Sequence, residues 1–373
     1  MITTSRQKPY TIGRRIREVA LIIFIALPLC VFPQKSLSGE VQLQKCWEYR
    51  YTGNAGPQIV SDSGSVFVRR ESSGIDAIAV DSGKLVWTTD VGGSIDSNLA
   101  VAGGNVVLVR KAVNPETPPS LVALSSVTGI TKWATTLRAG EEFVLVPSGG
   151  TIVVISRSGS ISGVDALGGS IVWTHSTPTE IVLSTVLGGP DLYFAYSDRN
   201  VRSISLAGIL SPGFSPFPFA LTSLVRSDDG AIVTGDERGQ ITAYSPLFRN
   251  VEWQFTSGAA VSSLLETDEL LIAASNDNFI YALSLGSGRR IWKKRVSGRV
   301  QSMRMMGPDA VVVQTIADSA VQVLSIKTGK SAGQIILPLG EVAVAITPVF
   351  PKMVSVLSDG ALYMFGGAGC KAK

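Results

Sequence analysis

The chain has 373 residues, of which 45% are hydrophobic and only 17% are charged. This composition provides a large apolar core and excludes a disordered chain. The formal net charge is +4, but residues 1–38 carry six basic side chains against one acidic one, so the remainder is near −1. A near-neutral body gives no electrostatic reason to expect nucleic acid as a partner.

The amino-terminal segment resembles a secretory signal. Residues 1–18 are basic and residues 19–32 are apolar, a stretch shorter than the roughly 20 residues that a membrane-spanning helix needs. Ser36-Leu37-Ser38 precedes Gly39 and has the small-x-small form of a cleavage site. We therefore predict that residues 1–38 are a signal peptide or a membrane anchor, and that residues 39–373 form one domain outside the cytoplasm.

Two alternatives to cleavage remain open. The apolar stretch is retained as a membrane anchor in the first. In the second, Cys30 carries a lipid, although the residue before it is Leu29, where lipoprotein signals have a small residue. In each case the protein is exported and is either periplasmic or anchored in a membrane.

A hairpin motif recurs along the chain. Its best copy is Ile280–Trp292, in which an alternating strand meets a glycine turn and a second strand ends on tryptophan, as in a β-hairpin. The common form is Ala-x-x-x-x-(Ser/Thr)-Gly-x-x-x-Trp. Its copies contain Ala77, Gly83 and Trp87; Ala123, Gly129 and Trp133; Gly169 and Trp173; Ala243 and Trp253; and Ala282, Gly288 and Trp292.

The turn glycines have a period of about 40 residues. They are Gly83, Gly129, Gly169, Gly208, Gly288 and Gly329, at intervals of 46, 40, 39, 80 and 41. The interval of 80 is two periods, because the copy that ends at Trp253 lies within it. A period of this length with four short strands is typical of a β-propeller blade.

Candidate catalytic residues are few. Acidic residues such as Asp198, Asp236, Asp277 and Asp359 stand at equivalent turns before the hairpins, where side-chain oxygens bond nearby backbone N–H groups. The chain contains one histidine, His175, which cannot build a His-rich metal site. We predict no catalytic, cofactor-binding or metal-binding residues, and no enzyme activity.

Two units depart from the repeat. The unit with Gly208 has Pro212 where the others have tryptophan, and the unit with Gly329 also lacks tryptophan. Residues 211–220 are rich in proline and phenylalanine. This segment is either a surface loop that grips a partner or a linker whose phenylalanines pack against the ring.

A basic stretch follows the best copy of the motif. Seven cations lie within 16 residues: Arg289, Arg290, Lys293, Lys294, Arg295, Arg299 and Arg304. We predict that they form a patch at the edge of one blade, which docks an acidic protein surface or an anionic lipid headgroup. The alternative is a solvated edge strand that its charges protect from aggregation.

The last repeat unit, residues 354–365, lacks its outermost strand. Residues 46–50, which include Trp47, supply a candidate strand from the other end of the chain. One blade would then contain both ends, which closes the ring and brings the count to eight blades. Cys46 and Cys370 would meet at this seam and form a disulfide in an oxidising compartment; the alternative is two unpaired thiols.

The repeat resembles that of the pyrroloquinoline-quinone family of propellers over about residues 45–366. The resemblance implies that its Gly and Trp positions lock neighbouring blades and are structural. Two kinds of family member compete as models. One is a quinone-dependent dehydrogenase, which is usually longer, binds calcium and often carries two adjacent cysteines, absent here. The other is similar to the propeller subunit of the outer-membrane β-barrel assembly machinery.

We therefore predict an all-β, eight-bladed propeller of four-stranded antiparallel blades, closed by the amino- and carboxy-terminal strands. Its predicted function is that of a non-catalytic, monomeric scaffold that binds envelope proteins, in outer-membrane protein assembly, without a cofactor and with membrane association. A quinone-dependent dehydrogenase-like protein is the alternative.

Overall fold

The computed structural model describes residues 43–51, 55–70, 73–111, 114, 116–177, 180–184, 191–211, 213–214, 217–227, 229–316, 320–349, 353–367 and 370. The chain divides into Met1–Ser38 and Gly39–Lys373, and all described residues belong to the second unit. The predicted signal peptide or anchor lies outside the described residues and stays a prediction. Within the described ranges, no helix has the length and apolar character needed to cross a membrane.

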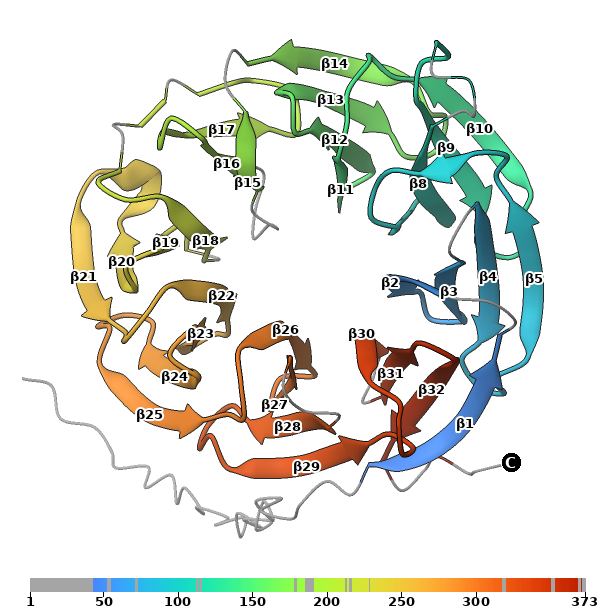
Figure 1. Cartoon of the computed structure of the whole chain (residues 1–373). Coiled ribbons are helices and arrows are strands. Elements are labelled where there is room, and N and C mark those ends of the chain that lie inside the picture. Colours follow the sequence, from blue (N-terminus) through green and yellow to red (C-terminus); the bar gives the residue numbers. More distant parts are fainter. Residues whose placement is uncertain are drawn as a thin grey trace, which may run out of the picture. The chain divides into compact units, whose positions relative to one another are not determined.

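The second unit is an eight-bladed β-propeller, which confirms the predicted fold class (Figure 1). Its antiparallel sheets surround a common centre, and we number them as blades in chain order. From the centre outward, blade 1 consists of β2 (Ala55–Ser61), β3 (Ser65–Arg70), β4 (Gly74–Ala79) and β5 (Leu85–Asp90). Blade 2 consists of β6 (Ser94–Ile95) and β7 (Ala100–Ala102), then β8 (Asn105–Lys111), β9 (Ser120–Ser125) and β10 (Thr131–Thr136).

The remaining blades follow the same order from the centre outward. Blade 3 consists of β11 (Phe143–Ser148), β12 (Thr151–Ser156), β13 (Ser160–Asp165) and β14 (Ile171–Ser176), and blade 4 of β15 (Ile181–Ser184), β16 (Asp191–Tyr196) and β17 (Val201–Ser205). Blade 5 consists of β18 (Leu221–Arg226), β19 (Ile232–Asp236), β20 (Gln240–Tyr244) and β21 (Val251–Thr256), with the short 3-10 turn η1 (Pro246–Phe248) between the last two. Blade 6 consists of β22 (Val261–Glu266), β23 (Leu270–Ser275), β24 (Phe279–Ser284) and β25 (Arg290–Arg295), and blade 7 of β26 (Val300–Met306), β27 (Ala310–Thr315), β28 (Ala320–Ser325) and β29 (Ser331–Ile336).

Blade 8 joins the two ends of the described chain. It consists of β30 (Ala343–Val349), β31 (Met353–Ser358), β32 (Ala361–Gly366) and, outermost, β1 (Gln44–Arg50). The β1 strand pairs antiparallel with β32, with Trp47 opposite Met364. The predicted closure of the ring by both terminal strands is therefore confirmed.

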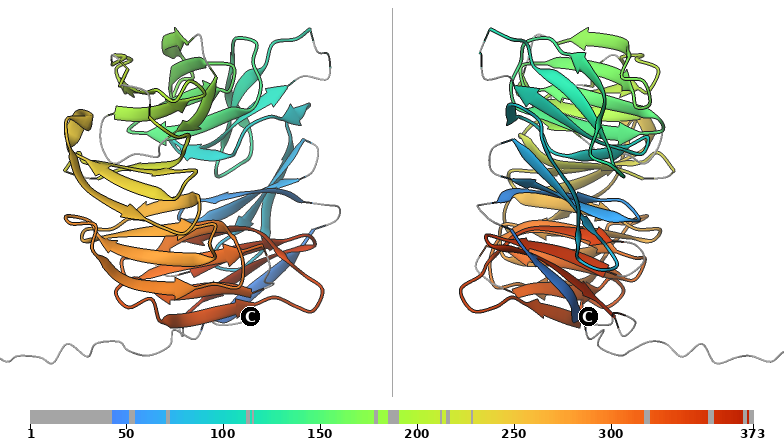
Figure 2. Two further views of the ribbon diagram at one scale, coloured as in Figure 1. Left: turned by 60° about the vertical axis from the view of Figure 1, so that its left-hand side comes forward. Right: turned by 90° about the vertical axis from the view of Figure 1, so that its right-hand side faces the viewer.

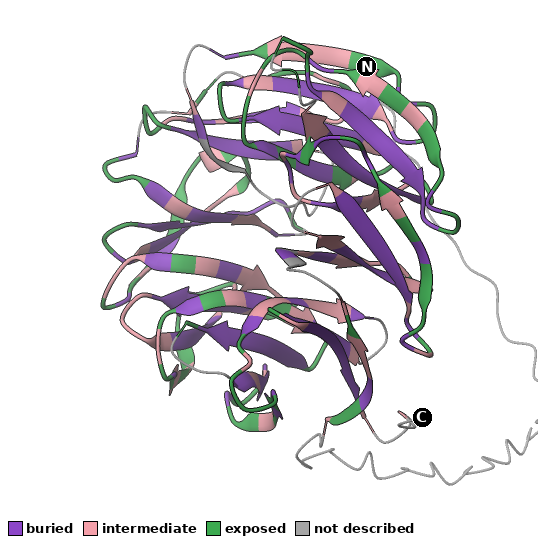
Figure 3. Ribbon diagram, turned by 45° about the vertical axis from the view of Figure 1, so that its right-hand side comes forward, coloured by how far each residue is buried: buried purple, intermediate pink, exposed green. Residues whose placement is uncertain are grey.

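The middle strands of each blade form the core. They are apolar along nearly their whole length, as in β23 and β27, because both faces of the sheet pack against neighbouring blades. The outermost strands alternate; β5 and β21 bury only the tryptophan and leave its neighbours exposed or half-buried. Figure 3 shows this gradient, with buried residues in the middle strands and exposed ones along the outer strands and turns.

Two blades differ from the predicted four-stranded form. In blade 2 the innermost strand is split into β6 and β7, which both pair with β8. In blade 4 three strands are described, and the fourth is reduced to two isolated bridges, Ile204 to Leu210 and Val201 to Phe214. Pro212, between these bridges in the sequence, has no N–H with which to continue a strand ladder.

The antiparallel order gives the ring two different faces (Figure 2). The turns between first and second strands and between third and fourth strands lie at the same end of each blade. We call this end the hairpin face and the third-to-fourth turns the outer turns. The second-to-third turns and the connections between blades lie on the other end, the linker face.

A disulfide takes the place of the outer turn in blade 8. The β32 strand ends and β1 begins on the hairpin face, where other blades have a continuous outer turn. Cys46 and Cys370 are joined there by a disulfide with a Cα–Cα distance of 5.2 Å. The covalent bond thus connects the third and fourth strands of this blade as the hairpin does in the others.

Candidate functional site

The tryptophans of the repeat join each blade to the next one. All six of them lie against the turn glycine of the following blade, and a Cβ added at Gly288 would stand 2.5 Å from Trp253. Because Gly288 has a φ of +64°, its conformation also favours glycine. Five indoles donate a hydrogen bond to an outer-turn carbonyl, for example Trp47 to Val80 at 2.7 Å and Trp292 to Ile326 at 2.7 Å.

Trp133 is the exception. Its indole lies over Gly169 as the motif requires, but its Nε1 is buried without a hydrogen-bond partner among the described residues. The carbonyl at the equivalent place belongs to Ala166, and it accepts a bond from Asn105 Nδ2 at 3.3 Å instead. At this one junction the indole packs against the next blade without donating a hydrogen bond to it.

A second contact reinforces three of these junctions. Two residues after the tryptophan, the side chain bonds the carbonyl of the turn glycine in the next blade. Thr89 donates to Gly129 at 2.8 Å, and Thr135 donates to Gly169. His175 occupies the same position, and its Nε2 lies 2.7 Å from the Gly208 oxygen. The single histidine of the chain thus has a structural contact, which the sequence did not predict.

We expect threonine to replace this histidine at little cost. His175→Ala should lower the free energy of unfolding by about 1 kcal/mol, because the Gly208 carbonyl loses its donor. His175→Thr should recover most of that loss, since Thr89 and Thr135 make the same bond in two other blades. Urea denaturation of the two variants measures the difference, and equal losses would show that the contact has no energetic value.

The two blades without tryptophan use other contacts. Between blades 4 and 5 an aromatic cluster fills the gap: Phe214 lies 4.4 Å from Phe248, and Phe217 contacts Tyr244 edge-on at 5.9 Å between ring centroids. These phenylalanines pack against the ring, whereas Phe219 remains 38% exposed. The proline- and phenylalanine-rich segment is therefore mainly a linker whose phenylalanines pack against the ring, and not a loop that grips a partner.

Between blades 7 and 8 apolar side chains of both sheets pack together, among them Val321, Ile335 and Ile346, and a carboxylate fixes the connecting segment to blade 8. Glu341 accepts hydrogen bonds from Tyr363 Oη at 2.8 and 2.9 Å and from Ser358 Oγ at 2.6 Å. Burial, followed by the bond to Glu341, raises the pKa of Tyr363, so the phenol stays protonated as a donor. This polar network lies on the linker face and holds the connecting segment against blade 8.

Three of the four acidic turn residues, Asp198, Asp236 and Asp277, make the turn hydrogen bonds predicted for them, whereas Ser358 takes this role beside Asp359. Asp236 accepts from the backbone N–H groups of Arg238 and Gln240, both at 2.9 Å, and Asp277 accepts from that of Phe279 at 3.0 Å. Across the described part of the chain, no three His, Cys, Asp or Glu side chains are grouped so as to hold a metal ion.

The seven cations of the basic stretch do not form one surface. Arg290, Lys293, Lys294 and Arg295 lie on β25, the outermost strand of blade 6, and Arg289 lies in the outer turn before it. Lys293 stacks over Phe279, 3.6 Å from the ring centroid. We call these five residues the basic edge.

The other two cations are placed differently. Arg299 is exposed in the connection to blade 7. Arg304 belongs to β26, the innermost strand of that blade, where its side chain is exposed. Arg304 is therefore separated from the basic edge by the width of the sheet.

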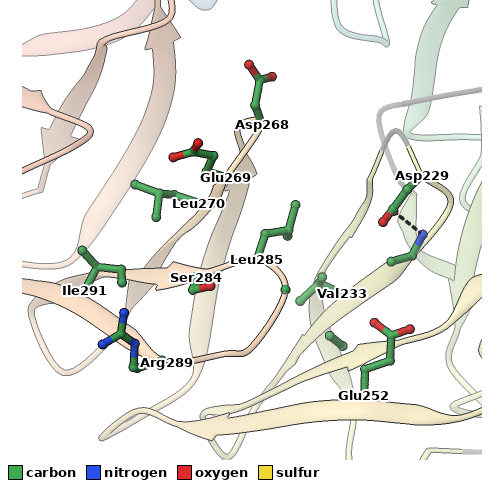
Figure 4. A pocket seen from close by; sticks show the side chains of 13 residues that line it. Asp229, Val233, Glu252, Asp268, Glu269, Leu270, Ser284, Leu285, Arg289 and Ile291 are labelled. Atoms are coloured by element: carbon green, nitrogen blue, oxygen red, sulfur yellow. Dashed lines mark hydrogen bonds between the residues drawn. The ribbon is translucent and has the colours of Figure 1, made fainter.

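A pocket of about 540 Å³ lies between blades 5 and 6, next to the start of the basic edge (Figure 4). Its floor is apolar and includes Ala231, Val233 and Leu285. The Leu285 carbonyl accepts a hydrogen bond from the Trp253 indole at 2.6 Å, so a docked tryptophan fixes this side of the pocket. The pocket and the basic edge together are called the blade 5–6 site.

Charged side chains surround the pocket. Asp229 and Glu252 come from blade 5, and Asp268, Glu269 and Arg289 from blade 6 (Figure 4). Bonds from Ser227 Oγ and from the Ala231 N–H, 3.0 Å away, lower the pKa of Asp229. This carboxylate is ionised at neutral pH. An apolar floor with a charged rim fits amino-acid side chains of a polypeptide.

Sequence reasoning found only one member of this pocket. Arg289 was selected because it opens a run of cations, whereas Glu252, Asp268 and Glu269 belong to separate turns and strands. Asp268 and Glu269 lie in the first-to-second turn of blade 6 and Glu252 is the second residue of β21, so their proximity becomes visible only once blades 5 and 6 are placed side by side.

The fold and its repeated contacts define a class: an eight-bladed propeller whose blades are joined by docked tryptophans. More particularly, the chain belongs to the family described as outer membrane protein assembly factor BamB, whose model matches residues 40–186 and 157–354. No curated protein sequence matches the chain.

Solved structures share the fold. The crystal structure of BamB from Moraxella catarrhalis is 17% identical, with 87% of this chain and 98% of that chain covered and a TM-score of 0.65. The computationally designed Ika8 protein is 16% identical, with 88% and 99% covered and a TM-score of 0.71. The C-terminal WD40 domain of Sif2 is 10% identical, with 87% and 98% covered and a TM-score of 0.70.

Proposed function

We propose that the protein is an exported, non-catalytic scaffold that binds a protein of the bacterial envelope and acts in outer-membrane protein assembly. Membership of the BamB family supports the setting. The observation that carries the proposal is the blade 5–6 site, where an open pocket adjoins a strand with a free outer edge.

The two halves of the site suit one polypeptide partner. Exposed cations at Arg290 and Arg295 attract an acidic surface and raise the rate of encounter. The pocket provides an apolar floor for a side chain of the same partner, which is the arrangement in which interface energy concentrates. Recognition thus uses charge on the basic edge and shape in the pocket.

Affinity capture from detergent-solubilised envelopes tests the basic edge. We expect the variant Arg289→Glu, Arg290→Glu, Arg295→Glu to capture at least tenfold less partner, because like charges then face each other. Lys293 is left unchanged since it stacks on Phe279. The matched control reverses three exposed cations elsewhere, Lys84, Lys132 and Lys330; an equal loss in both variants would argue against a specific site.

A bulky residue at the mouth of the pocket provides a second test. Gly286 lines the pocket, and a Cβ there would have no atom within 4 Å, so Gly286→Trp blocks the space without strain. Gly360, equally open but on the linker face of blade 8, is the control position. Capture that survives Gly286→Trp would remove the pocket from the proposal.

The non-catalytic part of the proposal has its own test. Saturable quinone binding with dye-coupled oxidation of an alcohol or sugar would contradict it.

A further inference from the structure

Exposed aliphatic side chains recur in the outer turns of four consecutive blades. Each of blades 2 to 5 presents one between its third and fourth strands, and we call the following set the aliphatic rim: Val127, Leu167, Ile209 and Leu247. Three of them are 72–75% exposed, namely Val127, Leu167 and Ile209. Single exposed aliphatic residues are ordinary, but four on consecutive outer turns form a continuous arc.

The shape of this arc fits a flat partner. Outer turns are the protruding ends of hairpins, and in a ring they all lie on the hairpin face. Each side chain stands at the tip of its own turn, so the rim is a row of projections. A protein groove accepts one projection, whereas a lipid interface meets all of them at the same depth.

The charges at the outer turns point to an anionic surface. The residues between third and fourth strands include Lys84, Arg249, Arg289, Lys327 and Lys330, with Asp81 as the acid among them. Two further acids, Asp165 and Glu252, stand in the strands that flank outer turns, whereas Asp268 and Asp309 belong to the first-to-second turns, closer to the centre of the ring. Basic side chains beside exposed aliphatic ones are typical of proteins that lie on anionic membranes.

We propose that the aliphatic rim rests on an anionic phospholipid surface, with the hairpin face of the propeller toward the membrane. The aliphatic tips enter the headgroup region, and the lysines and arginines of the outer turns pair with phosphates. The blade 5–6 site begins on the same face. A partner embedded in that membrane would therefore meet the site at the level of the bilayer.

Vesicle flotation tests the proposal on residues 39–373, which contain the whole ring core and both cysteines of the closing disulfide. We expect the ring to float with phosphatidylethanolamine–phosphatidylglycerol vesicles and to bind phosphatidylcholine vesicles more weakly. High salt should reduce binding, because exposed charges are screened. The variant Leu167→Asn, Ile209→Asn, Leu247→Asn should bind at least tenfold less.

The matched control changes three exposed aliphatic residues on the linker face: Ile316, Ile336 and Leu339, each to asparagine. All six positions are exposed, so neither variant should lose its fold. Equal binding by the two variants, or no flotation of the unchanged ring, would overturn the proposal. Size-exclusion chromatography tests whether a second copy of the chain covers the rim instead. If the unchanged ring were a dimer that did not bind vesicles, and only the rim variant were monomeric, the proposal would also be overturned.

A depth measurement uses the full chain. In a Cys30→Ser background reconstituted into the same vesicles, a fluorophore at Ile209→Cys should be quenched at least threefold more by a lipid-attached quencher than one at Ile316→Cys. Equal quenching would contradict the orientation. Partner capture in detergent depends on the basic edge and the pocket, and not on the aliphatic rim, so either proposal can fail alone.

Discussion

Trp253→Ala is expected to lower the free energy of unfolding by about 3–5 kcal/mol, the range for removing a large buried aromatic side chain. The indole is 8% exposed, lies over Gly288 and donates to the Leu285 carbonyl at 2.6 Å. Its removal leaves a cavity between blades 5 and 6 together with an unpaired carbonyl. Denaturant titration followed by far-UV circular dichroism measures the loss.

Phenylalanine substitutions divide that energy into packing and hydrogen bonding. Trp253→Phe keeps an aromatic ring but leaves the Leu285 carbonyl without its donor, which costs about 1–3 kcal/mol. Trp133→Phe loses no such bond, because the Trp133 Nε1 is buried without a partner among the described residues. We expect Trp253→Phe to be the more destabilising of the two. Equal losses would mean that ring packing alone determines the strength of a junction.

The repeat pattern predicted the architecture because the same physical contact occurs at six junctions. Each contact needs a glycine at positive φ and an indole at a fixed spacing, so the same residue types recur along the sequence, as at Gly83 and Gly288. The closure by β1 was also predictable, since Trp47 fills the position that the last repeat unit lacks. Contacts that recur are readable in a single sequence.

Contacts that occur once were not predictable. The cluster of Phe214, Phe217 and Phe248 fills one junction that lacks tryptophan, and apolar packing that includes Ile335 and Ile346 fills the other, but neither has a repeated spacing. Arg304 was grouped with the basic edge because it is close in sequence, yet the chain crosses from the circumference to the centre between Arg295 and Val300. The pocket likewise depends on two blades lying next to each other.

The disulfide at the seam has the second large expected effect. Joining Cys46 to Cys370 closes a loop with a sequence separation of 324, and in the chain-entropy model a loop this long stabilises the folded state by about 6 kcal/mol. We expect the double variant Cys46→Ser, Cys370→Ser to lose most of that free energy of unfolding. The double change is needed because a single one leaves a reactive thiol at the seam. Non-reducing mass spectrometry of the unchanged protein should show the linked peptide.

Reduction separates the covalent bond from the packing around it. A reductant should bring the unchanged protein to the stability of the double variant and leave that variant unaffected. Hydrogen exchange should then quicken first in β1, because the remaining connections of this strand are its ladder with β32 and the Trp47 contacts to Val80 and Gly83. If the double variant were as stable as the unchanged protein, those non-covalent contacts alone would close the ring, and the disulfide would stabilise only the chain ends.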